Sequence, residues 1–190
     1  SGKTAAFVLP VLQQLLTEPV RTPRPVRALV LVPTRELAAQ VGEVFRNLRP
    51  DGPRALRVAV LFGGVSVNPQ MMGLRGGADV VVATTGRLLD LVAHNALRLS
   101  DVQHLVLDEA DRLLDLGFAD ELQRVLALLP AKRQNLLFSA TFAPAVQSLA
   151  EAMLHNPERV TIAHTEANTP DIAQRAIQVN EKSRTALLCH

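Results

Sequence analysis

A short apolar run that stops at a cluster of carboxylates is the feature that most constrains this chain. The run covers residues 105–107 and ends at Asp108, and the next three residues add Glu109 and Asp111. A segment that is apolar on both of its faces suits a strand covered by helices on both sides, and ligands of such sheets gather at the carboxyl ends of the strands. The sequence therefore predicts an α/β fold with a mostly parallel sheet, and it places Asp108 at the functional edge.

Two interpretations of these carboxylates are open. A carboxylate at the end of a strand can hold the Mg²⁺ that accompanies nucleotide phosphates, and Glu109 beside it can orient or deprotonate an attacking water. Acidic residues are also common in the first turn of a helix, because they meet the positive end of its dipole.

Composition limits the remaining choices. The chain has 190 residues, of which 48% are hydrophobic, so it can bury the core of one domain with a fragment of another. A formal net charge of +2 means that any nucleic-acid site is local, and the absence of Trp and Tyr argues against a base-stacking platform. The single cysteine, Cys189, excludes an internal disulfide, and no apolar stretch is long enough to span a membrane, so we expect a cytoplasmic protein. The five histidines lack metal-ligand spacing.

The first four residues, Ser1-Gly2-Lys3-Thr4, are typical of the second half of a phosphate-binding loop. In such loops backbone amides and the lysine meet the β- and γ-phosphates, and the threonine hydroxyl reaches Mg²⁺. The sequence does not begin with methionine, so we expect residues before Ser1 to complete the loop. An ordinary helix start over residues 5–16, with a kink at Pro10, is the alternative. Together with Asp108, however, the loop supplies complementary halves of one Mg-nucleotide site.

Small, hydroxyl and arginine residues follow three predicted strands. The strand ends carry Pro33, Thr34 and Arg35 after residues 28–32, Gly63 and Gly64 after residues 56–61, and Thr84, Gly86 and Arg87 after residues 79–83. Helix capping by Thr34 and a tight glycine turn explain single clusters. Three clusters at successive strand ends favour a shared track for a phosphate backbone.

The rest of the chain adds further elements. A strand over residues 134–138 ends at Ser139 and Thr141, whose hydroxyls either reach Asp111 or cap a helix over residues 144–154. Residues 18–27 are predicted to be a solvated loop, 160–163 a last strand, and 164–171 a linker. A strand over 172–179 and a helix over 182–188 follow.

In their order along the chain, six of these segments resemble the motif series of the DEAD-box RNA helicases. They are Gly2-Lys3-Thr4, residues 33–38, residues 62–64, residues 84–90, residues 106–111 and residues 139–141. Residues 62–72 and 133–138 further resemble the bacterial RhlE-like branch. The resemblance covers residues 1–165 and implies a first RecA-like P-loop NTPase domain, with residues 166–190 as the interdomain linker and the start of the second RecA-like domain.

The resemblance also implies roles for individual residues. Ser1, Gly2, Lys3 and Thr4 would bind ATP phosphates, with Thr4 and Asp108 holding Mg²⁺ and Lys3, Asp108 and Glu109 serving catalysis. Pro33, Thr34, Arg35, Gly63, Gly64, Thr84, Gly86 and Arg87 would contact the RNA backbone without reading its sequence. Asp111, Ser139 and Thr141 would couple the nucleotide state to domain closure.

The chain departs from this family in three respects that affect function. The adenine-reading segment, the first residues of the phosphate loop and the strand that leads into them are missing before Ser1. In addition, Thr85 stands where the family usually has proline, and most of the second domain, which in this family supplies the arginine finger, is absent. We therefore expect the full-length protein to be an RNA-stimulated ATPase that unwinds short duplexes, and the isolated chain to be poorly active. Two alternatives are a P-loop motor acting on DNA and a non-catalytic module that binds nucleotide and RNA.

Overall fold

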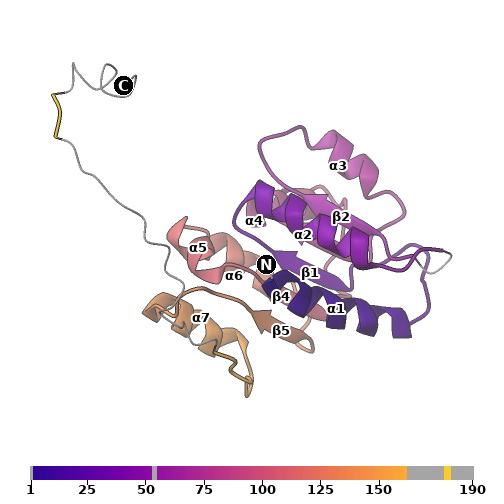
Figure 1. The fold of residues 1–190 in the computed structure, drawn as a ribbon. Coiled ribbons are helices and arrows are strands. Elements are labelled where there is room, and N and C mark those ends of the chain that lie inside the picture. Colours follow the sequence, from indigo (N-terminus) through magenta and orange to yellow (C-terminus); the bar gives the residue numbers. More distant parts are fainter. Residues whose placement is uncertain (1, 53–54, 162–177, 181–190) are drawn as a thin grey trace. The chain divides into compact units, whose positions relative to one another are not determined.

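A five-stranded parallel sheet forms the centre of the computed structural model, which describes residues 2–52, 55–161 and 178–180 (Figure 1). The strands are β1 (Ala28–Leu31), β2 (Val58–Leu61), β3 (Val80–Ala83), β4 (His104–Leu107) and β5 (Gln134–Leu137). Their order across the sheet is β2-β3-β1-β4-β5, and every neighbouring pair is parallel. The predicted parallel sheet is confirmed.

Helices connect the strands, as a parallel sheet requires. They are α1 (Gly2–Thr17), α2 (Arg35–Leu48), α3 (Asn68–Gly73), α4 (Thr85–Ala93), α5 (Ala110–Asp115), α6 (Ala119–Ala127) and α7 (Pro144–Met153). Helix α1 begins three residues earlier than the sequence pattern predicts and continues through Pro10. None of the helices in the described ranges is both long and apolar enough to cross a membrane.

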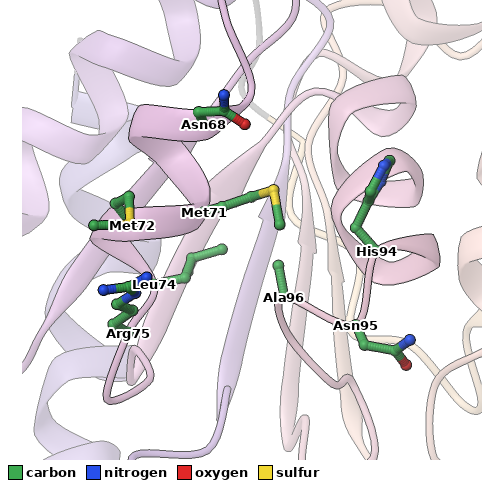
Figure 2. Close-up of a pocket in the computed structure, with 8 residues that line it drawn as sticks. All are labelled: Asn68, Met71, Met72, Leu74, Arg75, His94, Asn95 and Ala96. Carbon is green, nitrogen blue, oxygen red and sulfur yellow. The ribbon is translucent and has the colours of Figure 1, made fainter.

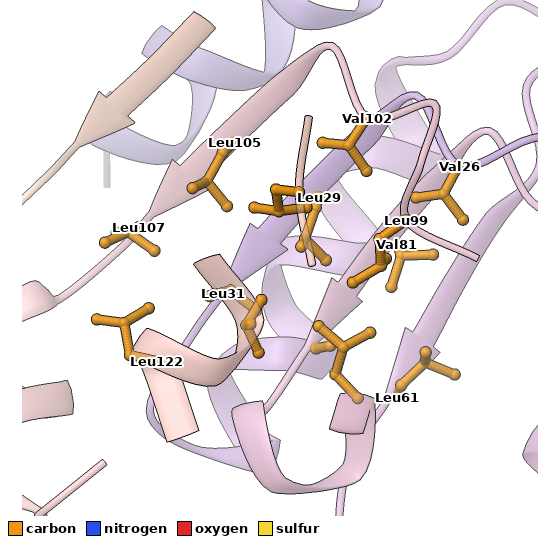
Figure 3. Close-up of a cluster of buried hydrophobic side chains, with 14 of the residues drawn as sticks. Val26, Leu29, Leu31, Leu61, Val81, Leu99, Val102, Leu105, Leu107 and Leu122 are labelled. Carbon is orange, nitrogen blue, oxygen red and sulfur yellow. The ribbon is translucent and has the colours of Figure 1, made fainter. Parts of the chain in front are cut away.

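Alternating strand residues separate the core into two layers. Leu29, Leu105 and their neighbours pack with α4, α6 and α7 on one face of the sheet (Figure 3). Val30, Val106 and their neighbours pack with α1 and α2 on the other face. The three central strands, β1, β3 and β4, are therefore buried on both sides, which explains their almost continuous apolar sequence, whereas the edge strands β2 and β5 are only partly buried.

The amino ends of the strands carry a buried charge network. Asp79, directly before β3, accepts hydrogen bonds from the guanidinium of Arg27 at 2.8 Å, the backbone amide of Arg57 at 2.9 Å and the guanidinium of Arg24. Arg27 also donates to the carbonyl of Leu15 at 2.9 Å. The prediction that residues 18–27 form a solvated loop is thus wrong for Arg27, whose charge is neutralised by Asp79 inside the protein.

The chain divides into two compact units, Ser1–Asn156 and Pro157–His190. The predicted strand over residues 160–163 is not seen in its described part, because Val160 is 85% exposed and no neighbouring strand pairs with residues 160–161. The predicted linker, the last helix and most of the strand over 172–179 lie outside the described residues. The domain boundary at residue 165 also falls there and stays a prediction.

Candidate functional site

The sheet order brings the predicted site residues to one edge. The residues that follow β2, β3 and β1 are the predicted backbone-binding clusters, and these three strands are neighbours in the sheet. The next strand, β4, leads to the carboxylates, and β5 leads to Ser139. Because all five strands are parallel, their carboxyl ends lie at the same edge.

Asp108 is a buried carboxylate at this edge, with 6% of its surface exposed. Its backbone amide donates to the carbonyl of Leu31 at 3.0 Å, which extends the pairing of β4 with β1. Burial raises the pKa of Asp108; the backbone hydrogen bond from Glu109 lowers it, the Glu109 carboxylate raises it and the Lys3 ammonium lowers it. Lys3 is therefore close enough to act electrostatically on Asp108, although the two residues are far apart in the sequence.

Glu109 has a left-handed backbone conformation, with φ of 52° and ψ of 53°. This conformation costs a residue with a side chain roughly 1–2 kcal/mol, and strained residues often occur at functional sites. The Glu109 side chain does not cap α5; its carboxylate instead lies 3.3 Å from the guanidinium of Arg112. Simple helix capping thus does not account for Glu109.

The predicted phosphate-binding residues form the first turn of α1. Gly2 and Lys3 are exposed and Thr4 is half-buried, whereas Ser1 lies outside the described residues. The amino end of a helix carries free backbone amides and a positive dipole end, both of which attract phosphate. The alternative of an ordinary helix start is compatible with this geometry, although it assigns no role to the electrostatic effect of Lys3 on Asp108.

The oxygen atoms of Asp108 and Thr4 suit a metal ion that is bound together with a nucleotide. Mg²⁺ at such sites is held by one or two carboxylates, water and phosphates. Asp108 and Thr4 offer that limited set, and no group of three or more His, Cys, Asp or Glu side chains in the described ranges can hold a metal.

Asp111 links β4 to the segment after β5. Its carboxylate accepts hydrogen bonds from the hydroxyl and the backbone amide of Thr141, both at 3.0 Å, and its own amide donates to the Ser139 hydroxyl at 3.2 Å. Burial raises the pKa of Asp111, but these hydrogen bonds, together with that of the Arg112 amide, bring it below its ordinary value. The hydroxyl of Thr141 thus reaches Asp111, and Ala143, not Ser139 or Thr141, occupies the N-cap of α7.

The cluster after β1 combines a capping residue with an exposed arginine. Pro33 is buried, and the Thr34 hydroxyl caps α2 by accepting from the amide of Leu37 at 3.3 Å. Arg35 is exposed and contacts Glu36 at 2.6 Å; this hydrogen bond raises the pKa of Arg35 and lowers that of Glu36. The capping explanation of Thr34 therefore holds, and it leaves Arg35 open to solvent.

The glycine turn after β2 lies beside the other two clusters. A Cβ added to Gly63 would meet no atom within 4 Å, so the backbone there faces open space. Gly64 has φ of +78°, and a Cβ added to it would lie 4.0 Å from a guanidinium nitrogen of Arg35. Arg87 donates to the carbonyl of Val65 at 2.7 Å. The three clusters therefore form one continuous surface.

The start of α4 contains Thr84, Thr85, Gly86 and Arg87. Thr84 is half-buried at the N-cap and Gly86 is exposed. Thr85 is only 1% exposed, and its hydroxyl has no hydrogen-bond partner among the described residues. The side chain of Arg87 is 9% exposed, and its Nε lies 3.5 Å from Asp90. One of its terminal guanidinium nitrogens donates to Val65, and the other is buried without a hydrogen-bond partner among the described residues.

One residue near this surface was not predicted from the sequence. The side chain of Gln70 on α3 makes two hydrogen bonds to the backbone of Phe62, directly before the glycine turn. A hydrogen bond from a side chain to the backbone does not require a particular residue type in its partner, so the sequence contains no pattern that predicts this contact. The only sequence signal is the position of Gln70 in the helix that starts at Asn68-Pro69.

A hollow of about 530 Å³ lies between α3 and the carboxyl end of α4 (Figure 2). It is lined by Asn68, Met71, Met72, Leu74, Arg75, His94, Asn95 and Ala96. None of the predicted site residues lines it, so the candidate site is an open sheet edge and not this hollow.

Comparison with known proteins gives consistent matches. The family model described as DEAD/DEAH box helicase matches residues 1–149. The chain is 42% identical to DEAD-box ATP-dependent RNA helicase CshA of Streptococcus pneumoniae, over 97% of this chain and 34% of the relative. It is 45% identical to ATP-dependent RNA helicase DeaD of Mycobacterium tuberculosis, over 96% of this chain and 31% of the relative.

A solved structure agrees with these sequence matches. The yeast DEAD-box splicing factor Prp28 superposes with a TM-score of 0.77 at 34% identity, covering 82% of this chain and 37% of that chain. The chain thus spans about a third of the length of the proteins it matches. These relatives do not specifically support the RhlE-like branch, which stays a prediction.

Proposed function

The chain belongs to the DEAD/DEAH box helicase family, and from this premise we propose that it is the first RecA-like domain of an ATP-dependent RNA helicase. In the proposal this domain binds ATP with Mg²⁺ and the backbone of one RNA strand. With a second RecA-like domain, for which residues 166–190 form the linker and first segment, it hydrolyses ATP to open short duplexes. A cytoplasmic location remains part of the same proposal.

The observation that carries the nucleotide site is the buried carboxylate of Asp108 at the carboxyl edge of the sheet, whose pKa the Lys3 ammonium lowers. The amides of the first turn of α1 and the Lys3 ammonium are suited to bind the ATP phosphates, with Ser1 and Gly2 contributing backbone contacts. Thr4 and Asp108 are suited to hold Mg²⁺, which would neutralise charge on the phosphates.

Glu109 is the residue proposed to activate water. The water oxygen attacks the γ-phosphorus as the bond from that phosphorus to the bridging oxygen of ADP breaks, and the water proton passes toward the Glu109 carboxylate. The left-handed backbone at Glu109 directs the chain away from β4 directly beside Asp108. This placement supports separate roles for two consecutive carboxylates.

The RNA site is proposed to follow the ends of β1, β2 and β3. Thr34, Arg35, the two glycines after β2 and the start of α4 are neighbours along this edge. Contacts to sugar and phosphate position a strand without reading its sequence. Target choice in this proposal therefore depends on other parts of the protein.

Asp111, Ser139 and Thr141 are proposed to transmit the nucleotide state. Their hydrogen bonds tie the segment after Asp108 to the segment after β5, so a shift at the γ-phosphate would reach both. ATP and RNA each favour the closed arrangement of two domains when they bind it more tightly than the open one.

A substitution of Glu109 tests the catalytic assignment. In the intact protein that contains this chain, we expect Glu109→Gln to retain ATP binding and to abolish turnover, because the amide cannot accept the water proton. ATP affinity and RNA-stimulated phosphate release are the measurements. Glu43→Gln, at an exposed position of α2, is the matched control. Unchanged turnover in Glu109→Gln would remove Glu109 from this role.

A motor acting on DNA is the main rival, since it would use the same phosphate site. The curated relatives described above are RNA helicases by name, which favours RNA. Comparing ATPase stimulation by single-stranded RNA and DNA of the same sequence distinguishes the two, and stronger stimulation by DNA would contradict the proposal.

A further inference from the structure

The side-chain carboxamide of Gln70 makes hydrogen bonds to the backbone of Phe62 through both its oxygen and its nitrogen. Its Oε1 accepts from the Phe62 amide at 3.1 Å, and its Nε2 donates to the Phe62 carbonyl at 3.0 Å. Phe62 directly follows β2, which lies at the edge of the sheet. The side chain thus makes a pair of hydrogen bonds like those that a neighbouring strand would make.

The turn beyond Phe62 is fixed on both sides. Gln70 holds Phe62, Arg87 holds the Val65 carbonyl at 2.7 Å, and only Gly63 and Gly64 lie between them. Gly63 faces open space and Gly64 has a positive φ. A glycine turn is the most flexible kind of backbone, so fixing it in advance lowers the entropy lost when a ligand binds.

The packing of α3 makes Gln70 an important attachment. Helix α3 contributes no fully buried residue. Met71 and Met72 line the hollow, and the Met71 side chain points from α3 toward Ala96 (Figure 2). The two bonds of Gln70 therefore join a loosely packed helix to the start of the glycine turn.

We infer that Gln70 is a positioning residue for the proposed RNA site: its carboxamide holds Phe62 and thereby keeps the Gly63-Gly64 turn in the conformation that meets the RNA backbone. Gln70 itself does not contact RNA in this arrangement, because both of its polar atoms are engaged with Phe62 and it is half-buried. The inference rests on the proposed RNA-binding function.

Gln70→Glu gives a specific test, because a protonated glutamate has the shape of glutamine and one O–H donor. At about pH 8 the introduced carboxylate is ionised, cannot donate to the Phe62 carbonyl and repels it, so we expect roughly tenfold weaker RNA binding. As the pH falls to about 4, below the ordinary pKa of glutamate, protonation should restore much of the affinity that the wild type shows at that pH. Gln70→Ala should bind weakly at every pH.

The probe is fluorescein-labelled decauridine, with the intact protein, Mg²⁺ and a non-hydrolysable ATP analogue. The wild type at each pH is the reference, because Arg35 and Arg87 near the turn and His94 at the hollow are common to all variants. Gln123→Glu, the same change at an exposed position of α6, should behave as the wild type does. Wild-type affinity of Gln70→Glu at about pH 8 would overturn the inference.

Amide hydrogen exchange provides a measurement that does not depend on RNA. In this chain without ligands, we expect faster exchange at Phe62 and Gly64 in Gln70→Ala than in the wild type, with the core strands unchanged. Unchanged exchange would overturn the positioning role. If the wild type binds no RNA, the proposed function fails, while the exchange result still decides whether Gln70 holds the turn.

Discussion

Thr85 carries an unpaired hydroxyl in a buried position at the first residue of α4. Proline is favourable at this position of a helix, because its fixed φ fits and the missing amide proton has no partner within the helix. The preceding residue, Thr84, has φ of −82° and ψ of 144°, the extended conformation that a following proline requires. The backbone is thus already suited to proline.

We expect Thr85→Pro to raise the free energy of unfolding by about 1 kcal/mol, since it restricts the unfolded chain and removes a buried unpaired polar group. Urea unfolding of this chain measures the change. Thr85→Val, which removes only the hydroxyl and keeps the shape, should account for part of the gain. A loss of stability in Thr85→Pro would show that the turn needs the amide of Thr85. RNA binding by this variant should be unchanged or tighter.

The contacts of charged and hydroxyl residues at strand ends could be predicted from the sequence, whereas contacts that depend on nearby backbone atoms could not. The contact of Thr141 with Asp111 was expected, because a hydroxyl residue and a carboxylate follow two strands of one sheet. Lys3 lowers the pKa of Asp108, which agrees with the expected shared site, and the roles of both residues stay predictions. Gln70 and Thr85 differ in this respect. Their environments depend on backbone atoms brought together by folding, and such contacts have no sequence pattern.

The start of β3 depends on Asp79. This buried carboxylate neutralises Arg27, which is also buried, and it accepts from Arg24 and from the Arg57 amide. Asp79→Asn would remove the closer counterion of the buried Arg27 and leave only the partly exposed Glu18, at 3.6 Å. Breaking a buried ion pair costs about 3–5 kcal/mol, and the remaining contact with Glu18 places the expected loss toward the lower end of that range. We expect that loss in urea unfolding at neutral pH, whereas Asp51→Asn at an exposed position should have little effect.

The pH dependence of this effect has a definite sign. Burial raises the pKa of Asp79, but the hydrogen bonds from Arg57, Arg24 and Arg27 bring it below its ordinary value in the folded protein. The stabilisation is therefore complete above the unfolded pKa and is lost as the pH falls through the folded pKa. The difference between wild type and Asp79→Asn should narrow below about pH 4. An equal difference at all pH values would contradict this account.

Strands and helices were mostly predicted with correct type and small errors at their ends. Apolar runs such as 105–107 and 80–83 identify buried parallel strands because both faces are covered. The loop over residues 18–27 was mispredicted because its composition, rich in proline and arginine, is the same whether an arginine meets water or a buried carboxylate. The order of the strands was also not predictable, since crossovers of similar length can place the next strand on either side.

In our proposal, ATP hydrolysis requires residues from the second RecA-like domain in addition to the site residues of this chain. In families that use an arginine finger, this residue increases turnover by roughly 10³–10⁵-fold. We expect this chain alone to hydrolyse ATP at least about a thousandfold more slowly than the intact protein, with no stimulation by RNA. Steady-state phosphate release with and without RNA is the measurement, and RNA-stimulated turnover by this chain would refute the expectation.

The position of β1 in the sheet also limits how early the sheet can form during protein synthesis. Both neighbours of β1, namely β3 and β4, come later in the sequence. During synthesis the ribosome therefore releases β1 well before either partner exists, and its hydrophobic side chains stay uncovered over that interval. Contacts between distant segments form slowly and leave intermediates prone to aggregation.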